Sequence, residues 1–139
     1  NWTLFKGLPY DDGTTRYLKR NFIIDYMIQI YHNNRCSKSR FGLKILEESG
    51  KDFEVVNYLE TIPTTKKLNY IVNLLGISPI ELVRKNEILW KQNYKNKELS
   101  DQDIIKIMVN NPKLIERPIV INDKKAVIGR PPEKIFDIL

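Results

Sequence analysis

The chain has 139 residues, of which 42% are hydrophobic and 29% are charged, which suits one compact domain with a sizeable core. Its formal net charge of +6 would permit binding to nucleic acid, but the basic residues are interleaved with acidic ones, so we expect neither a nucleic-acid partner nor a membrane surface. No apolar run approaches the length of a transmembrane helix, and one cysteine cannot form an internal disulfide. A cytoplasmic protein without a metal site or a tightly bound cofactor is therefore expected.

Residues 1–26 differ in character from the rest of the chain. They contain a turn-like stretch at 9–15 and a short isolated apolar run at 22–24, but neither a long apolar core nor a small-residue cleavage site, as a secretory signal would. We interpret residues 1–26 as an N-terminal extension, either a cloning remnant or upstream translated sequence. An arm that binds a lipid surface or a partner is the weaker alternative. Residues 27–139 form the well-patterned domain.

The first half of this domain alternates between apolar runs typical of strands and apolar spacing typical of helices. Thr64 or Thr65 can cap the second helix, and Gly50 and Gly76 follow the two helices, as helix-ending glycines do. The expected order is a strand at 28–32, a helix at 37–49, a strand at 53–58 and a helix at 64–75.

The second half begins with two helices that start at serine residues. Ser78 is followed by a proline and then by Glu81, which is a capping-box pattern, and Ser100 can cap a further helix. Two short apolar runs around a polar turn then indicate a hairpin. The expected order is helices at 78–84 and 100–110, strands at 119–121 and 126–128, and a last helix at 132–139. The whole order predicts an α/β fold in which helices pack on a mixed four-stranded sheet.

The only cysteine, Cys36, lies between the first strand and the first helix of this order. The first-turn N–H groups of a helix have no internal partners and, with the helix dipole, shift a thiol at that position toward thiolate. His32 and the cations Arg35, Lys38 and Arg40 add positive charge nearby. Because these neighbours are polar and basic, we favour a reactive thiol over a buried, inert one. Cys36 is the candidate nucleophile.

Four short motifs, in this order, carry a resemblance to a known family. They are HNNRCSKSR at 32–40, LVRKNE at 82–87, ERPIV at 116–120 and IGRPPE at 128–133. Together they resemble the glutaredoxin-coupled arsenate reductases, over residues 27–139. The resemblance implies a thioredoxin-like fold with flanking helices and a helical insertion between its two halves, in agreement with the expected order of elements.

The resemblance also implies that Cys36 attacks arsenate and that Arg84, Arg117 and Arg130 hold the oxyanion. A tetrahedral anion needs several charge-assisted donors, and the guanidinium fork suits paired oxygens better than an ammonium does. Any one of these arginines alone would be interpreted as a surface charge. All three, however, lie beside breaks in the expected secondary structure, where side chains can converge on a cleft. We expect them to form one oxyanion site.

Further roles follow from the same resemblance. His32 and Ser39 are expected to support the thiolate, His32 as a neighbouring cation or a hydrogen-bond donor, although a strand-end histidine bonded to backbone is a close alternative. Pro118 is expected to follow a cis peptide bond, against the general preference for trans. The chain departs from many related sequences at Asn34, where they carry proline.

A covalent thiol–arsenate needs two electrons to become arsenite. Ser39 stands where a Cys-x-x-Cys pair would have its second thiol, and no other cysteine can resolve the intermediate. The resemblance implies glutathione as the co-substrate that attacks the adduct. It also implies that glutaredoxin is the partner that reduces the mixed disulfide and that arsenite is released.

Three other functions stay open. A redox-sensing transcriptional regulator of the Spx type shares the fold, but usually carries a paired cysteine and lacks the Gly-Arg-Pro-Pro turn found at 129–132. A glutathione-dependent thiol reductase of the same superfamily would act on no arsenic at all. A non-catalytic binding module would have an ordinary pKa at Cys36.

Overall fold

The computed structural model describes residues 27–139, so the extension predicted at 1–26 lies outside the described residues. The strands are β1 (Ile28–Tyr31), β2 (Phe53–Val56), β3 (Ile119–Asn122) and β4 (Lys125–Ile128). The α-helices are α2 (Ser37–Glu48), α3 (Thr65–Leu75), α4 (Ile88–Asn93) and α5 (Asp101–Asn110). Three shorter 3-10 helices are η2 (Pro79–Leu82), η3 (Pro112–Leu114) and η4 (Pro132–Ile138).

The four strands form one mixed sheet in the order β2-β1-β3-β4. β1 pairs in parallel with β2 and antiparallel with β3, and β3 and β4 form an antiparallel hairpin. The parallel pair matters for function, because the chain leaves β1 and β2 at the same edge of the sheet. This arrangement confirms the mixed four-stranded sheet that the sequence predicts.

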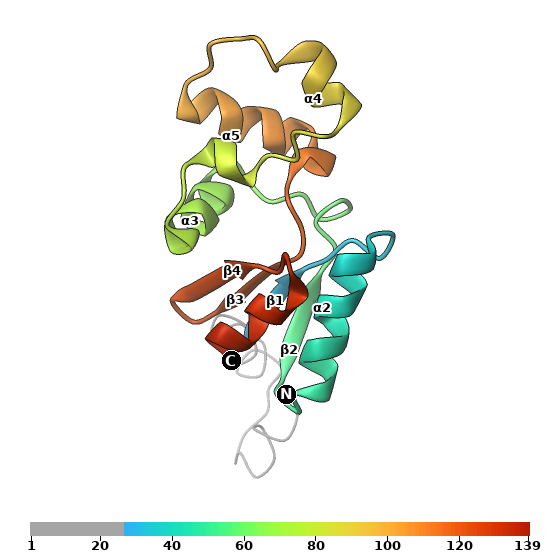
Figure 1. The fold of residues 1–139 in the computed structure, drawn as a ribbon. Helices are drawn as coiled ribbons and strands as arrows, with labels where there is room; N and C mark the ends of the chain where they lie inside the picture. The colour runs from blue at the N-terminus through green and yellow to red at the C-terminus, as the bar shows by residue number, and fades with distance from the viewer. Residues whose placement is uncertain (1–26) are drawn as a thin grey trace, which may run out of the picture.

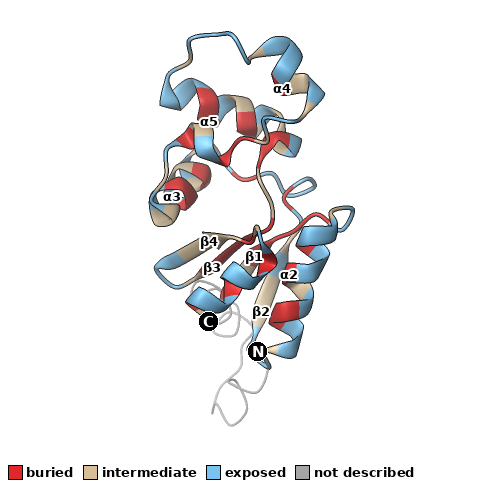
Figure 2. Ribbon diagram, in the orientation of Figure 1, coloured by how far each residue is buried: buried red, intermediate tan, exposed pale blue. Residues whose placement is uncertain are grey.

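Alternate residues of the strands face two separate hydrophobic clusters. Ile28 and Ile30 of β1 pack with Ile45 and Leu46 of α2, whereas Tyr31 belongs to the cluster on the opposite face. Helix η4 joins α2 on the first face, and α3 covers the second face together with buried residues of α5. The protein therefore has a central sheet between two helical layers, with α4 and α5 extending beyond it (Figure 1), and the buried positions follow this division (Figure 2).

Between α3 and β3 lies the helical insertion, which contains α4, α5 and η3. Two backbone hydrogen bonds and one isolated β-bridge close its base. They join Arg84 N to Leu114 O at 2.7 Å, Glu116 N to Leu82 O at 2.8 Å, and Val83 to Ile115. We call residues 82–84 and 114–116 the neck of the insertion. The neck brings Arg84 close to the backbone that leads into Arg117, although the two are far apart in sequence.

The local capping signals predict helix ends accurately. Thr64 Oγ1 accepts a hydrogen bond from Lys67 N at 3.1 Å, and Ser100 forms a capping box with Asp103 at the start of α5. Gly76 ends α3 with a φ of 68°, in the left-handed region that glycine adopts without strain. Within residues 27–139, no helix has both the length and the apolar character needed to cross a bilayer.

Several expected elements differ by one residue at an end, such as the first strand, which ends at Tyr31 rather than at His32, and three differ by more. The second strand ends at Val56 rather than at residue 58, because Asn57 O accepts hydrogen bonds from the N–H groups of Glu60 and Thr61 and turns the chain. The helices expected at 78–84 and 132–139 are the 3-10 helices η2 and η4. Helix α4 was not expected. It has no side-chain cap, and Trp90 is its only fully buried residue.

Candidate active site

Cys36 is the N-cap residue of α2, at the end of the loop that leaves β1. Asn33 shapes this loop: its carbonyl accepts a hydrogen bond from Cys36 N and its Oδ1 accepts one from Arg35 N, both at 3.0 Å. Cys36 O in turn accepts the first helical bond, from Arg40 N at 3.0 Å. The backbone thus fixes the thiol at the positive end of α2. Sequence reasoning did not single out Asn33.

Ser39 is fully buried beneath the loop and binds two of its residues. Its Oγ lies 2.7 Å from His32 Nδ1 and accepts a hydrogen bond from Asn33 N at 3.0 Å. Burial lowers the pKa of His32 below its ordinary 6.5; the hydrogen bond with Ser39 opposes this shift, and the positive charge of Arg40 adds to it. A lowered pKa favours the neutral imidazole. Of the two roles expected for His32, the hydrogen-bonding one therefore fits better than that of a cation beside the thiolate.

The pKa of the Cys36 thiol lies below its ordinary value. Burial acts in the opposite direction, but the backbone N–H groups of Ser39 and Lys38 and the guanidinium of Arg117 donate to the sulfur and outweigh it. The first turn of α2 therefore stabilises a thiolate, as its position in the sequence predicts. An ordinary pKa, which a non-catalytic binding module would have, does not match this environment.

Arg117, two residues before β3, is the arginine that contacts the thiol. Its Nη1 donates to Lys113 O at 3.1 Å. Its Nε is buried and has no hydrogen-bond partner among the described residues, and none of the described carboxylates forms an ion pair with it. A partly buried cation with a buried, unused donor beside a nucleophile is the arrangement expected for binding an anion.

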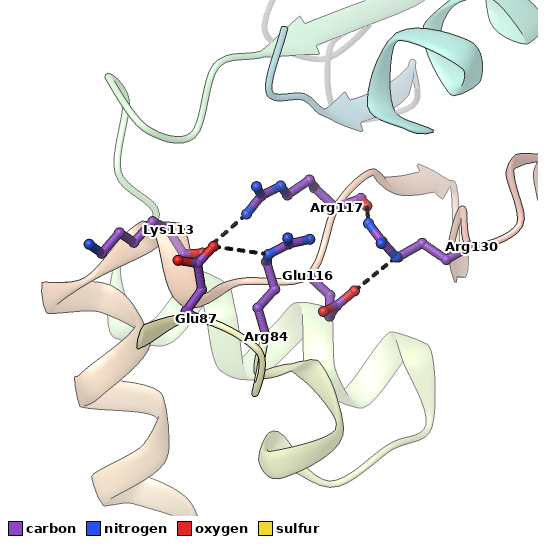
Figure 3. A network of polar contacts seen from close by, with 6 residues as sticks. All are labelled: Arg84, Glu87, Lys113, Glu116, Arg117 and Arg130. Atoms are coloured by element: carbon purple, nitrogen blue, oxygen red, sulfur yellow. Dashed lines mark hydrogen bonds and ion pairs between the residues drawn. The ribbon is translucent and has the colours of Figure 1, made fainter. Parts of the chain in front are cut away.

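Arg84 and Arg130 lie near Arg117 but are held by carboxylates (Figure 3). Arg84 Nε lies 3.4 Å from Glu87 Oε1, and Arg130 Nε lies 3.2 Å from Glu116 Oε2. Arg130 Nη1 also donates to Arg117 O at 3.0 Å. Within the described chain, each guanidinium keeps at least one terminal amino group without a protein acceptor. The structure thus gathers the three predicted arginines in one place and leaves donors on each.

The peptide bond between Arg117 and Pro118 is cis, as the resemblance implies, and the bond between Arg130 and Pro131 is also cis, which was not predicted. Pro118 packs between two glycines. A Cβ at Gly42 of α2 would lie 3.0 Å from Pro118 Cγ, and one at Gly129 would lie 2.9 Å from it. Only glycine permits this approach. The helix that carries the thiol is thus packed directly against the residue that follows Arg117.

Sequence reasoning missed one further residue at this site, Tyr58. It lies in the turn after β2, is 1% exposed, and its phenol group lies against Arg117 and Asn33, with Arg84 close enough to influence its pKa. The available signal was topological. If the two strands are parallel, residues that follow them meet at one sheet edge, so Tyr58 and the Cys36 loop should be neighbours.

The fold is thioredoxin-like, with a candidate thiol nucleophile at its first strand–helix junction, a cis-proline before the third strand and a group of arginines nearby. Comparison with known proteins agrees. Residues 31–138 match the model of the ArsC family, and the chain belongs to this family.

Three relatives illustrate the similarity. The uncharacterized protein YfgD of Escherichia coli K12 is 48% identical over 114 residues, which cover 81% of this chain and 96% of that protein. An arsenate reductase of Neisseria meningitidis serogroup A is 41% identical over 114 residues, with coverages of 81% and 97%. A solved structure of an arsenate reductase from Vibrio cholerae aligns with a TM-score of 0.78 and 41% identity, covering 82% of this chain and 98% of that one. These matches confirm the expected family and fold.

Proposed function

We propose that this protein reduces arsenate to arsenite through a covalent adduct on Cys36, with glutathione and glutaredoxin as electron donors. The observation that carries the proposal is the contact between the activated Cys36 thiol and Arg117, whose buried Nε has no partner among residues 27–139. A nucleophile and an anion-binding donor are thereby adjacent. The names of relatives such as the Neisseria meningitidis protein support arsenate as the anion.

Binding and attack would proceed as follows. Arg117, Arg84 and Arg130 draw in the oxyanion and neutralise its charge, so that an anionic thiolate can approach an anionic substrate. The Cys36 sulfur then forms a bond to arsenic, and one oxygen leaves as hydroxide or water. His32 and Ser39 hold the loop that presents the thiol.

Reduction requires two electrons, which two sulfur atoms supply. A glutathione thiolate attacks the sulfur of Cys36, the bond between sulfur and arsenic breaks, and its electron pair stays on arsenic, which leaves as arsenite. Cys36 and glutathione are then joined in a mixed disulfide. Glutaredoxin reduces this disulfide and restores the Cys36 thiol. Ser39 has no thiol to offer, so an external thiol is required.

A site for glutathione is suggested by a hollow beside the first turn of α2, lined by Ser37, Lys38, Phe41, Pro132 and Glu133. Phe41 is 56% exposed and offers an apolar contact, while Lys38 offers a cation to a carboxylate. The hollow adjoins the residue that carries the thiol, so a co-substrate bound there could reach the adduct. These reactants are expected in the cytoplasm, where we place the protein.

The test is arsenate-dependent oxidation of NADPH in an assay coupled through glutathione, glutathione reductase and glutaredoxin. Intact-mass analysis after arsenate and glutathione should show one glutathione adduct, confined to Cys36, that glutaredoxin removes. Efficient reduction of arsenate by thioredoxin without glutathione would contradict the electron donors. If Cys36 acquires glutathione but never consumes arsenate, the protein is instead a glutathione-dependent thiol reductase.

A further inference from the structure

Two side-chain polar atoms in the described part of the chain are buried without a hydrogen-bond partner, Tyr58 Oη and Arg117 Nε. Leaving a buried donor unpaired costs free energy, so such groups are rare and call for an explanation. The two residues are neighbours, because the positive charge of Arg117 is near enough to the Tyr58 phenol to lower its pKa. Because the two unpaired groups lie in the same place, we look for one partner that explains both of them.

The two orphaned groups cannot satisfy each other. A guanidinium has donors and no acceptor, so even a bond from Arg117 to the phenol oxygen would leave the Tyr58 proton without an acceptor. The other residues near Tyr58 do not supply an acceptor for its proton either. Asn33 Oδ1 accepts from Arg35 N and has a second lone pair, but the Tyr58 hydroxyl forms no hydrogen bond with it, and Arg84 is another donor. A single ligand with several acceptor oxygens would satisfy both unpaired groups together.

We infer that the Tyr58 hydroxyl donates a hydrogen bond to the bound oxyanion, beside Arg117 and Arg84, and so selects an anion that presents an unprotonated oxygen to it. The inference rests on the proposed function, because it assigns a further contact to the same anion. Burial raises the pKa of Tyr58, with smaller opposing effects from Arg117 and Arg84, so the phenol keeps the proton that it would donate.

The turn after β2 explains how the phenol comes to lie there. Asn57 O accepts from Thr61 N at 2.8 Å and from Glu60 N at 3.0 Å, so the chain turns back and Tyr58 is buried under the edge of the sheet. His32 N, at the start of the thiol loop, donates to Val56 O at 2.9 Å and ties the two strand ends together. The turn that carries Tyr58 is thus held next to the loop that carries Cys36.

The experiment compares Tyr58→Phe with Tyr70→Phe, which removes the same hydroxyl from a residue that is 46% exposed on α3. Each protein is titrated with sodium arsenate, and with inorganic phosphate, while iodoacetamide alkylation of Cys36 is followed. The anion concentration that halves the alkylation rate should rise about tenfold in Tyr58→Phe, the effect of losing one hydrogen bond to a charged group. It should not change in Tyr70→Phe.

Thermal unfolding without anion gives an independent readout. Since the Tyr58 hydroxyl has no hydrogen-bond partner within residues 27–139, Tyr58→Phe should unfold at the same temperature as the wild type or at a higher one. The rise in unfolding temperature on adding arsenate should be smaller in Tyr58→Phe. A variant that unfolds earlier without anion, or fails to fold, would show that the hydroxyl has a structural partner, and this would overturn the inference.

The outcomes separate this inference from the proposed function. Equal anion protection of Cys36 in Tyr58→Phe and wild type overturns the role of Tyr58, whatever the coupled assay shows. Weaker protection in Tyr58→Phe together with no reduction of arsenate supports the role of Tyr58 while the proposed function fails. If neither arsenate nor phosphate protects Cys36 in the wild type, the protein has no oxyanion site. Both the role of Tyr58 and the proposed function are then overturned.

Discussion

The thiol side of the site is built from one stretch of chain, residues 32–39, whereas the arginine side gathers residues from three distant places. On the thiol side, the hydrogen bonds of Asn33 and Ser39 join residues that are at most seven positions apart. On the arginine side, Arg84 follows η2, Arg117 precedes β3 and Arg130 follows β4. Within residues 27–139, the local side has paired its polar groups internally, and the assembled side retains unpaired donors.

This difference indicates a division of labour between the two sides. Satisfied hydrogen bonds fix the geometry of the thiol before any ligand arrives, which favours a reactive and well-placed nucleophile. Unsatisfied donors carry an energetic cost that an anion can relieve, which favours binding. The predictions below test the two sides separately, beginning with the largest expected effect.

Replacing the nucleophile should abolish the chemistry altogether. Cys36→Ser should fold normally and lose all arsenate-dependent turnover, because a hydroxyl at this site is not ionised and cannot form the thiol adduct. The coupled NADPH assay measures the loss, and circular dichroism checks the fold. Substantial residual turnover would place the nucleophile elsewhere.

Replacing an arginine should weaken anion handling but leave the nucleophile in place. We expect each of the variants Arg84→Ala, Arg117→Ala and Arg130→Ala to lower kcat/KM for arsenate. The loss should correspond to on the order of 2 kcal/mol or more of transition-state free energy, the range for losing a partner of a buried charged hydrogen bond. Arg117→Ala should in addition raise the pKa of Cys36, since it removes a donor to the sulfur. The pH dependence of iodoacetamide alkylation reports that shift.

The matched control for these arginines is Lys95→Ala, which removes a positive charge from an exposed residue beyond α4. It should leave both kcat/KM and the alkylation profile unchanged. Three arginine variants that behave like Lys95→Ala would show that the oxyanion site is misplaced.

Removing the hydroxyl beneath the loop tests the thiol side. Ser39→Ala leaves Asn33 N and His32 Nδ1 without their partner, so the free energy of unfolding should fall by about 1 to 3 kcal/mol. The pKa of Cys36 should change little, because the backbone N–H of Ser39, which the variant keeps, donates to the sulfur. Urea unfolding of Ser39→Ala beside Ser37→Ala, whose side chain is exposed, measures the effect. Equal stability of the two variants would contradict it.

The smallest effect concerns the protonation of His32, the only histidine in the chain. Its folded pKa lies below 6.5 because burial disfavours the imidazolium, so the unfolded chain takes up the proton first as the pH falls. The stability from this group is complete above pH 6.5 and declines as the pH drops from 6.5 toward the folded pKa. An NMR titration should give a value below 6.5. The drop in stability from neutral to mildly acidic pH should be smaller in His32→Gln, and a titration at or above 6.5 would refute the argument.

Sequence patterns predicted what depends on neighbouring residues. The caps at Thr64 and Ser100, the stop at Gly76 and the activated position of Cys36 all follow from interactions within one helical turn. The three arginines were expected in one site only through the resemblance to a family. Tyr58 and α4 escaped prediction because their places are determined by contacts between segments distant in sequence, which no local pattern records.

The neck of the helical insertion has a consequence for how the family can vary. Its backbone hydrogen bonds hold Arg84 and the approach to Arg117 independently of the loop at 94–100, which connects α4 to α5 and is largely exposed. The entropic cost of a longer closed loop grows only slowly with its length. Residues can therefore be added or removed at 95–98, the exposed middle of this loop, without moving the arginines, which makes it a point at which evolution or protein engineering can attach new sequence to an unchanged site.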